Sequence, residues 1–99
     1  MIKGILGCKV RPDKDIQPML LKLRSHAMQY PGLKSVENLV NEENVSVVAM
    51  VSTWEKLEDW RSWEESMITQ ELLRQAETLL VEEPRVTTYR MVAPEVWWA

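Results

Sequence analysis

Residues Val45–Thr53, VSVVAMVST, form the stretch of sequence that decides the fold. Valine dominates it, and β-branched residues are typical of strands. In an extended strand Val48 and Met50 share one face with serines, and the other face is apolar throughout. That second face carries Val45, Val47, Ala49 and Val51. A strand with one face in water would alternate apolar and polar side chains, so this pattern predicts a strand that is covered on both faces.

Three further strands and two helical regions are predicted around this one. The other strands are residues 2–10, 33–40 and 85–92, and a polar turn at residues 41–44 joins the second strand to Val45–Thr53. Asp13 or Asp15 can cap the first helix, and Pro18 falls within its first turn, where a missing N–H costs least. That helix ends at Pro31-Gly32, and helical spacing places Ile16, Leu20, Leu23, Ala27 and Tyr30 on one face.

The second helical region begins with Thr53–Trp63, TWEKLEDWRSW, which holds three of the five tryptophans. Leu57, Trp60 and Trp63 recur every three residues, and a second apolar stripe starts at Met67. In one straight helix, at about 100° per residue, these two stripes would point to nearly opposite sides. We therefore predict a break near residues 64–66, with Ser66 capping the second half.

The order β-α-β-β-α-β predicts an α+β, ferredoxin-like fold with a four-stranded antiparallel sheet and both helices on one face. We expect residues 1–99 to form a single domain, with its core in residues 2–92 and an apolar tail at 93–99. The helices leave the second sheet face open, so we expect a homodimer that buries sheet against sheet. Trp97 and Trp98 in the tail are expected to pack across that dimer or over a helix edge, or else to cover a pocket.

Composition limits the partners of the chain. A net charge of −3 and an isoelectric point of about 5.2 argue against nucleic acid and anionic membranes. One cysteine, Cys8, and one histidine, His26, can form neither an internal disulfide nor a closed zinc site, so we expect no metal. The N-terminus does not resemble a signal peptide and no apolar run is long enough for a membrane span, which predicts a cytoplasmic protein.

Two segments resemble the antibiotic biosynthesis monooxygenase family. Tyr30–Glu37, YPGLKSVE, is similar to the segment that joins the first helix to the second strand in that family. Ser52–Glu55, followed by Trp63 and Ser66, resembles its strand end, half-helix and break. The resemblance spans residues 2–92 in the right order and implies a dimeric α+β barrel, with one pocket per protomer between the sheet and the two helices. It is more specific for fold than for activity, because one fold hosts unrelated functions.

The resemblance implies an oxygenase without metal or flavin, which converts a small electron-rich aromatic of the quinol or anthrone type into a quinone with dioxygen. The haem-degrading branch of the family is disfavoured. Its strand asparagine falls at Gly7 or Cys8 here, and its iron-ligating histidine falls at Leu72 or Leu73. The alternative function is a non-catalytic homodimer that binds a small hydrophobic molecule or serves as an interaction module.

The candidate substrate-binding residues are Trp63, Trp60 and Met50. Trp63 either lines the pocket or belongs to the core, while Trp54 and Trp60 are interpreted mainly as packing residues. The polar candidates for catalysis are His26, Asn38, Tyr30 and Tyr89, each of which has an ordinary structural alternative. We also expect Cys8 and the six methionines to act as core residues; the methionines include Met19, Met28, Met50, Met67 and Met91.

Overall fold

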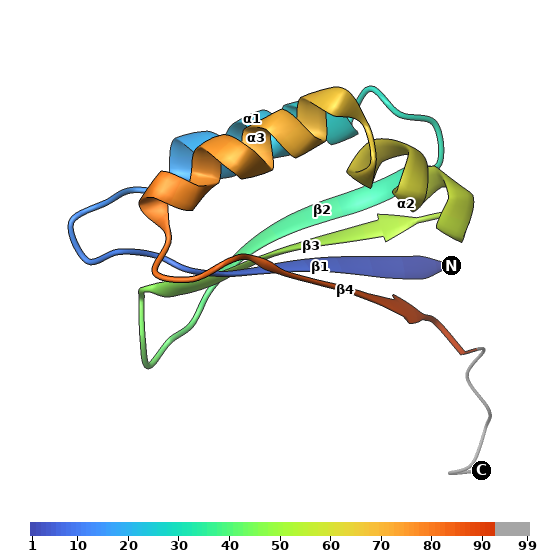
Figure 1. Cartoon of the computed structure of the whole chain (residues 1–99). Coiled ribbons are helices and arrows are strands. Elements are labelled where there is room, and N and C mark those ends of the chain that lie inside the picture. Colours follow the sequence, from blue (N-terminus) through green and yellow to red (C-terminus); the bar gives the residue numbers. More distant parts are fainter. Residues whose placement is uncertain (93–99) are drawn as a thin grey trace, which may run out of the picture.

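The computed structural model describes residues 1–92, which form one antiparallel sheet with helices on one face (Figure 1). The strand order is β2-β3-β1-β4. This arrangement confirms the predicted α+β, ferredoxin-like class. The strands are β1 (Ile2–Lys9), β2 (Leu33–Val40), β3 (Val47–Trp54) and β4 (Arg85–Arg90). Trp97 and Trp98 lie outside the described residues, so the predictions on the tail stay predictions.

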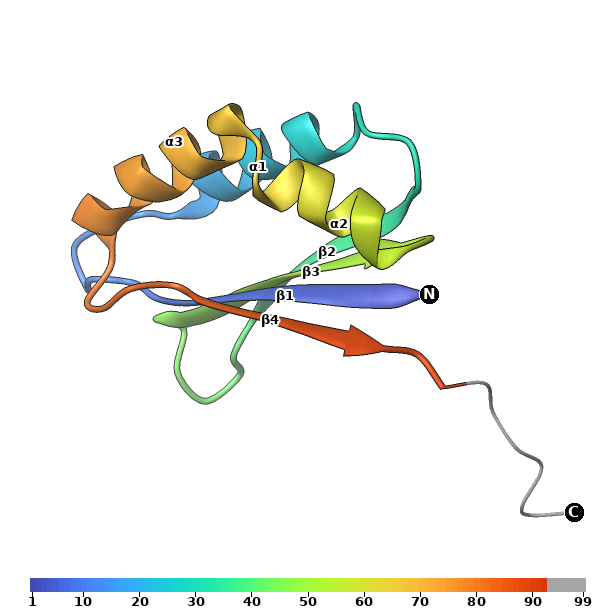
Figure 2. The ribbon, with the colours of Figure 1, turned by 45° about the vertical axis from the view of Figure 1, so that its right-hand side comes forward.

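Three α-helices and a 3-10 turn cover one face of the sheet. They are α1 (Gln17–Ala27), α2 (Leu57–Glu64), α3 (Met67–Ala76) and the turn η1 (Glu77–Leu79). Figure 2 shows α1 beside α3, with α2 over the end of the sheet where β1 begins and β3 ends. The predicted break is confirmed, because Ser66 caps α3 by accepting a hydrogen bond from the backbone N–H of Thr69 at 3.3 Å.

The start and end of α1 differ from the prediction. Its N-cap is Ile16, which has no side-chain acceptor, and Asp15 instead accepts a hydrogen bond from the backbone N–H of Gln17 at 2.9 Å. Pro18 lies in the first turn, as predicted. The helix ends at Ala27, so Tyr30 follows it and packs on the core from the connection to β2. Gly32 in that connection has φ +91°, a conformation that favours glycine.

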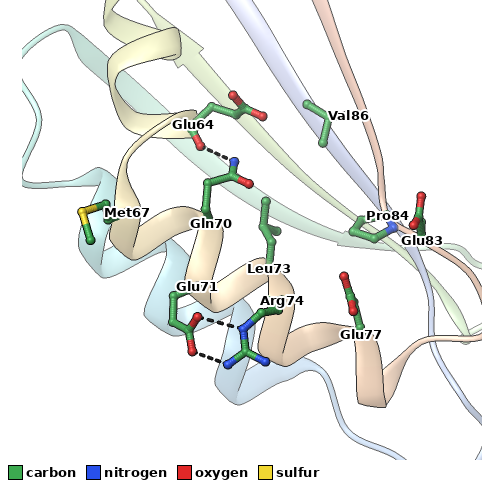
Figure 3. A pocket seen from close by; sticks show the side chains of 10 residues that line it. All are labelled: Glu64, Met67, Gln70, Glu71, Leu73, Arg74, Glu77, Glu83, Pro84 and Val86. Carbon is green, nitrogen blue, oxygen red and sulfur yellow. Dashed lines mark hydrogen bonds and ion pairs between the residues drawn. The ribbon is translucent and has the colours of Figure 1, made fainter.

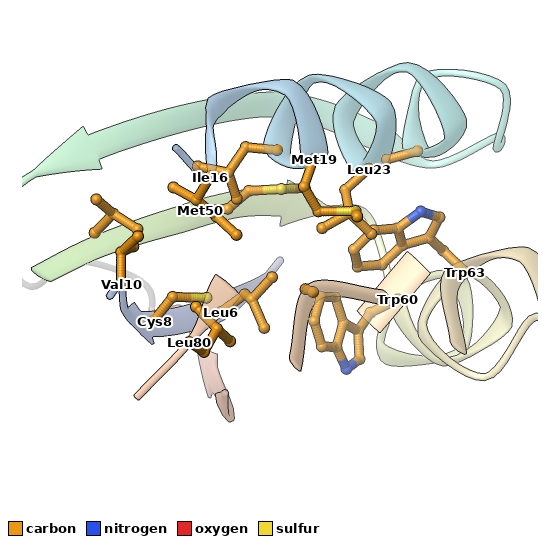
Figure 4. Close-up of a cluster of buried hydrophobic side chains, with 14 of the residues drawn as sticks. Leu6, Cys8, Val10, Ile16, Met19, Leu23, Met50, Trp60, Trp63 and Leu80 are labelled. Atoms are coloured by element: carbon orange, nitrogen blue, oxygen red, sulfur yellow. The ribbon is translucent and has the colours of Figure 1, made fainter. Parts of the chain in front are cut away.

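The core lies between the sheet and the helices (Figure 4). Strand β3 contributes Val48, Met50, Ser52 and Trp54 to its inner face, and all four are buried. Cys8 on β1 is also buried, as predicted, and burial raises the pKa of its thiol to about 11. Since the thiolate is the reactive form, Cys8 is a packing residue at neutral pH.

The outer sheet face carries a strip of apolar side chains that no helix covers. Ile5, Ala49 and Val51 are half-buried there, while 36% of Val47 and 47% of Leu39 are exposed. The outer face also has a polar end, where Lys3 Nζ donates a hydrogen bond to Thr53 Oγ1 at 3.0 Å. β3 is therefore apolar on both faces, but residues 1–92 seal only its inner face from water.

Two predictions about packing are wrong. Met28, Met67 and Met91 are exposed rather than buried. Helix α3 buries Thr69 and Ala76, whereas Met67 and Ile68, which begin its predicted apolar stripe, face solvent. Periodicity identifies residues that share a face, but the neighbouring elements decide which face is covered.

Candidate functional site

Three indoles form a cluster where α2 meets the sheet. The ring centroid of Trp63 lies 5.8 Å from that of Trp54 and 5.3 Å from that of Trp60. The relative exposures of Trp54, Trp60 and Trp63 are 0%, 5% and 2%. Trp60 lies directly on Gly4 of β1, where a Cβ atom would be only 2.2 Å from its ring. The cluster exists because Gly4 leaves room for an indole against the backbone of a central strand.

The buried indole N–H groups of this cluster are not all satisfied. Trp54 Nε1 donates a hydrogen bond to Ser52 Oγ at 2.8 Å. Trp63 Nε1 is equally buried and has no hydrogen-bond partner among the described residues. Figure 4 shows the nitrogens of Trp60 and Trp63 pointing in opposite directions. A buried donor without a partner costs free energy, and such groups mark places where a ligand atom or water is received.

Asn38 carries a second unpaired polar atom in the same layer. It lies on β2 opposite Met50 of β3, so its side chain is on the inner sheet face. Asn38 Oδ1 is buried and has no donor among residues 1–92. The layer between sheet and helices therefore holds one unpaired donor from the helix side and one unpaired acceptor from the sheet side.

His26 and Tyr30 lie together at the C-terminal end of α1. Their rings meet edge to face with centroids 5.2 Å apart. His26 Nε2 is 3.1 Å from Ser66 Oγ, and Ser66 Oγ donates to the backbone carbonyl of Trp63 at 2.7 Å. This chain of hydrogen bonds ties α1 to the break between α2 and α3. His26 thus holds the segment that carries Trp63.

Tyr89 and Met50 are the two remaining candidate residues. Tyr89 pairs with Lys3 of β1 in a register that places it on the outer sheet face, where it is 60% exposed. Met50 lies on the inner face and is 1% exposed. The structure therefore brings Trp60, Trp63, Met50 and Asn38 into the layer between sheet and helices, and it places Tyr89 on the opposite side of the sheet.

An open groove of about 780 Å³ runs between α3 and β4 (Figure 3), and we call it the α3–β4 groove. Leu73 of α3 and Val86 of β4 supply its apolar walls. Gln70 closes one end by donating a hydrogen bond from Nε2 to the backbone carbonyl of Glu64 at 2.7 Å. The groove opens along β4, which is exposed over its whole length.

Neither a metal centre nor a membrane helix is found in residues 1–92. They contain no cluster of three or more histidine, cysteine, aspartate or glutamate side chains that could hold a metal ion. Within the same range, every helix is too short or too polar to cross a membrane.

Comparison with solved structures identifies proteins that share this fold. A candidate antibiotic biosynthesis monooxygenase from Deinococcus radiodurans matches with a TM-score of 0.86 at 10% sequence identity, over 97% of each chain. One from Nitrosomonas europaea matches with a TM-score of 0.83 at 13% identity, over 94% of this chain and 91% of that one. One from Bordetella bronchiseptica gives 0.77 at 21% identity, over 93% and 97%. The chain has the antibiotic biosynthesis monooxygenase fold.

No protein-family model and no curated protein matches the sequence. The likeness to the antibiotic biosynthesis monooxygenase structures is thus one of fold, at identities of 10–21%. Any argument about function therefore depends on the side chains of this chain. The relevant ones are the tryptophan cluster, the two buried polar atoms without a partner among residues 1–92, and the charges of the α3–β4 groove.

Sequence reasoning missed three side-chain contacts of the structure. The hydrogen bond between His26 and Ser66 joins residues 40 positions apart, so no pattern of neighbouring residues predicts it. The role of Ser52 as the acceptor for Trp54 depends on a buried strand end. The pairing of Glu71 with Arg74 could have been predicted, because residues three apart on a helix are neighbours.

The contact between Glu71 and Arg74 should be visible in the titration of the Glu71 carboxyl. Hydrogen bonds from Arg74, with a smaller contribution from Gln75, lower the pKa of Glu71 to about 2. Arg74→Met should raise that pKa toward the ordinary 4.5, measured by carbon NMR of the carboxyl group. Because the folded pKa is the lower one, the stabilisation from this pair is present above about pH 4.5 and is lost as the pH falls toward 2. The variant should lose that part of the pH dependence.

Lys34→Met is the matched control for this titration. Lys34 pairs with Glu55 at 2.8 Å and lowers the pKa of that carboxyl instead. The control should therefore raise the pKa of Glu55 and leave that of Glu71 unchanged. An unchanged Glu71 titration in Arg74→Met would contradict the assignment.

Proposed function

We propose that this chain is an oxygenase that works without metal or flavin on a small electron-rich aromatic of the quinol or anthrone type. Two observations support the proposal. The fold is that of candidate antibiotic biosynthesis monooxygenases. The observation that carries it furthest is the buried N–H of Trp63, which has no partner among the described residues and is therefore free to donate to a substrate oxygen.

In the proposed chemistry, the main roles of the protein are to position the substrate and to exclude water from it. Oxidation of an anthrone-type CH₂ by dioxygen gives a carbonyl and one water, so the substrate supplies all the electrons and no further reductant is needed. Transfer of the first proton to a base, for which His26 is the candidate, leaves negative charge on the substrate oxygen. A donor fixed in a dry site stabilises that charge, and Trp63 Nε1 is such a donor. Asn38 Oδ1 can accept a hydrogen bond from a second hydroxyl of a quinol.

Access to Trp63 requires a local movement. The side chain is only 2% exposed, so a ligand reaches its N–H only if α2 shifts away from the sheet. Helix α2 is eight residues long and is the shortest α-helix among residues 1–92, so it is the segment that we propose to move. The α3–β4 groove, with Leu73 and Val86 as apolar walls, is the proposed route. His26, Tyr30 and Tyr89 stay secondary candidates for catalysis.

Oxygen consumption with a panel of quinols and anthrones tests the function. We expect turnover by the purified protein without added metal or flavin. Trp63→Phe should lower turnover by about 100-fold, the usual loss on removing one oxyanion donor. Trp54→Phe, whose N–H is already used by Ser52, should retain most of the activity below its melting temperature. Binding of the panel without turnover would favour the alternative function, a non-catalytic module that binds a small hydrophobic molecule.

We also propose that the protein is a homodimer joined through the outer sheet face, in the cytoplasm. The uncovered strip of Ile5, Ala49 and Val51 supports this, because such a strip in the middle of a sheet is usually buried by a partner. Val51→Lys should convert the dimer into a monomer in sedimentation experiments at micromolar concentration. Val45→Lys, at a site that is already 76% exposed, should leave the dimer intact. A monomeric wild-type chain would overturn the proposal.

A further inference from the structure

The α3–β4 groove has a strongly unequal charge. Of the described residues, four carboxylates and one cation line it (Figure 3). Glu71 and Arg74 come from α3, while the others come from the end of α2, from η1 and from the connection to β4. These three are Glu64, Glu77 and Glu83. At neutral pH the groove therefore presents a surplus of negative charge to any molecule that approaches along β4.

The single cation is already occupied. Arg74 Nε donates to Glu71 Oε2 at 2.9 Å, and Arg74 Nη2 pairs with the other oxygen of the same carboxylate. Gln75 Nε2 also donates to this carboxylate at 3.3 Å, which holds it in place. An anionic ligand could recruit Arg74 only by displacing Glu71. The next cation on this face of β4 is Arg90, which is four residues from Val86 and hence about 13 Å away along the strand.

The apolar part of the groove suits a flat ring. Leu73, Pro84 and Val86 line it together, and the carboxylates surround these apolar side chains. A ligand that lies on this surface places its ring against the apolar residues and its substituents among the carboxylates. The ring substituents, rather than the ring, therefore meet the charge of the groove.

We propose that the α3–β4 groove selects its aromatic ligand by charge, taking neutral or cationic rings and rejecting carboxylated or sulfonated ones. This inference rests on the proposed function and names the class of substrate for the same route. The carboxylates are mostly exposed, so each contributes little, and salt screens them within about 10 Å at 0.1 M. We expect a cationic ring to bind about tenfold more tightly than its anionic counterpart at low ionic strength, and the ratio to fall toward one at high ionic strength.

Three anthraquinones with one ring system and different substituents test the inference. The substituents are a trimethylammoniomethyl group, a hydroxymethyl group and a sulfonate, and affinity is measured by titration calorimetry at low and high ionic strength. The expected order of affinity is cationic, then neutral, then anionic. The double variant Glu64→Gln/Glu77→Gln should bring the ratio between cationic and anionic probes close to one. Glu42→Gln, in the exposed turn between β2 and β3, is the matched control and should leave the ratio unchanged.

The outcomes separate this inference from the proposed function. Equal affinity for the three probes, or tightest binding of the sulfonate, overturns the charge selection and leaves the function standing. The expected order without any oxygen consumption by the quinol panel supports charge selection and overturns the oxygenase. Failure of all three probes to bind overturns the charge selection, because the groove would then not be a route for aromatic ligands, and oxygen consumption by the quinol panel still decides the oxygenase.

Discussion

Trp63→Ala is expected to lower the free energy of unfolding by about 3–5 kcal/mol, measured by chemical denaturation. Trp63 is only 2% exposed and contacts both other indoles of the cluster, so its removal leaves a cavity that the neighbours cannot fill. This value is the one expected of a core residue. The sequence left Trp63 open between core and pocket wall. A smaller loss of stability, together with weaker ligand binding, would favour the pocket wall.

Trp63→Phe separates the ring from its N–H group. The ring of phenylalanine keeps much of the packing, and the N–H that is lost has no partner among the described residues, so we expect a cost of on the order of 1–2 kcal/mol. Trp54→Phe is the matched comparison. It breaks the bond to Ser52 Oγ and leaves that buried hydroxyl without its donor, which should add about 1–3 kcal/mol. Equal costs for the two variants would mean that the N–H of Trp63 is satisfied by water.

Gly4→Ala should cost about 3 kcal/mol, the upper end of what overpacking a core usually costs. A Cβ atom at Gly4 would lie 2.2 Å from Trp60 Cζ3, far inside contact distance. Neither the backbone at Gly4 nor the ring of Trp60 can move easily to relieve this contact. Gly4 pairs with β3 and with β4 on its two sides, and the ring of Trp60 lies against Trp54 and Trp63.

Gly7→Ala is the control within the same strand. Its Cβ would be 3.9 Å from the nearest atom, the backbone oxygen of Arg85, which is ordinary contact. We therefore expect a change within about 0.5 kcal/mol, with the oligomeric state of each variant checked by sedimentation. Combining Gly4→Ala with Trp60→Leu should cost less than the sum of the two single changes, because the smaller side chain relieves the contact. Similar costs for Gly4→Ala and Gly7→Ala would show that the approach of Trp60 is not the limiting contact.

Much of the fold could be predicted because local signals carried it. Pro31-Gly32 indicated where the first helix gives way to the second strand, although α1 already ends at Ala27. The change of apolar face between Trp63 and Met67 predicted the break, after which Ser66 caps α3. The valine-rich stretch predicted the strand β3, which lies in the middle of the sheet. These signals are local because capping, turn formation and strand preference depend on residues a few positions apart. Trp54 and Trp60 were predicted as packing residues, and both are buried.

The sequence by itself determined the order of the elements and the residues that share a face. Tertiary structure alone decided which faces are covered. It left Met67 in solvent, brought His26 to Ser66 and placed Trp60 on Gly4. It also left the N–H of Trp63 without a partner among the described residues and gathered the carboxylates of four separate segments along one groove. These outcomes depend on distances between segments far apart in the chain, and no pattern of neighbouring residues encodes such distances.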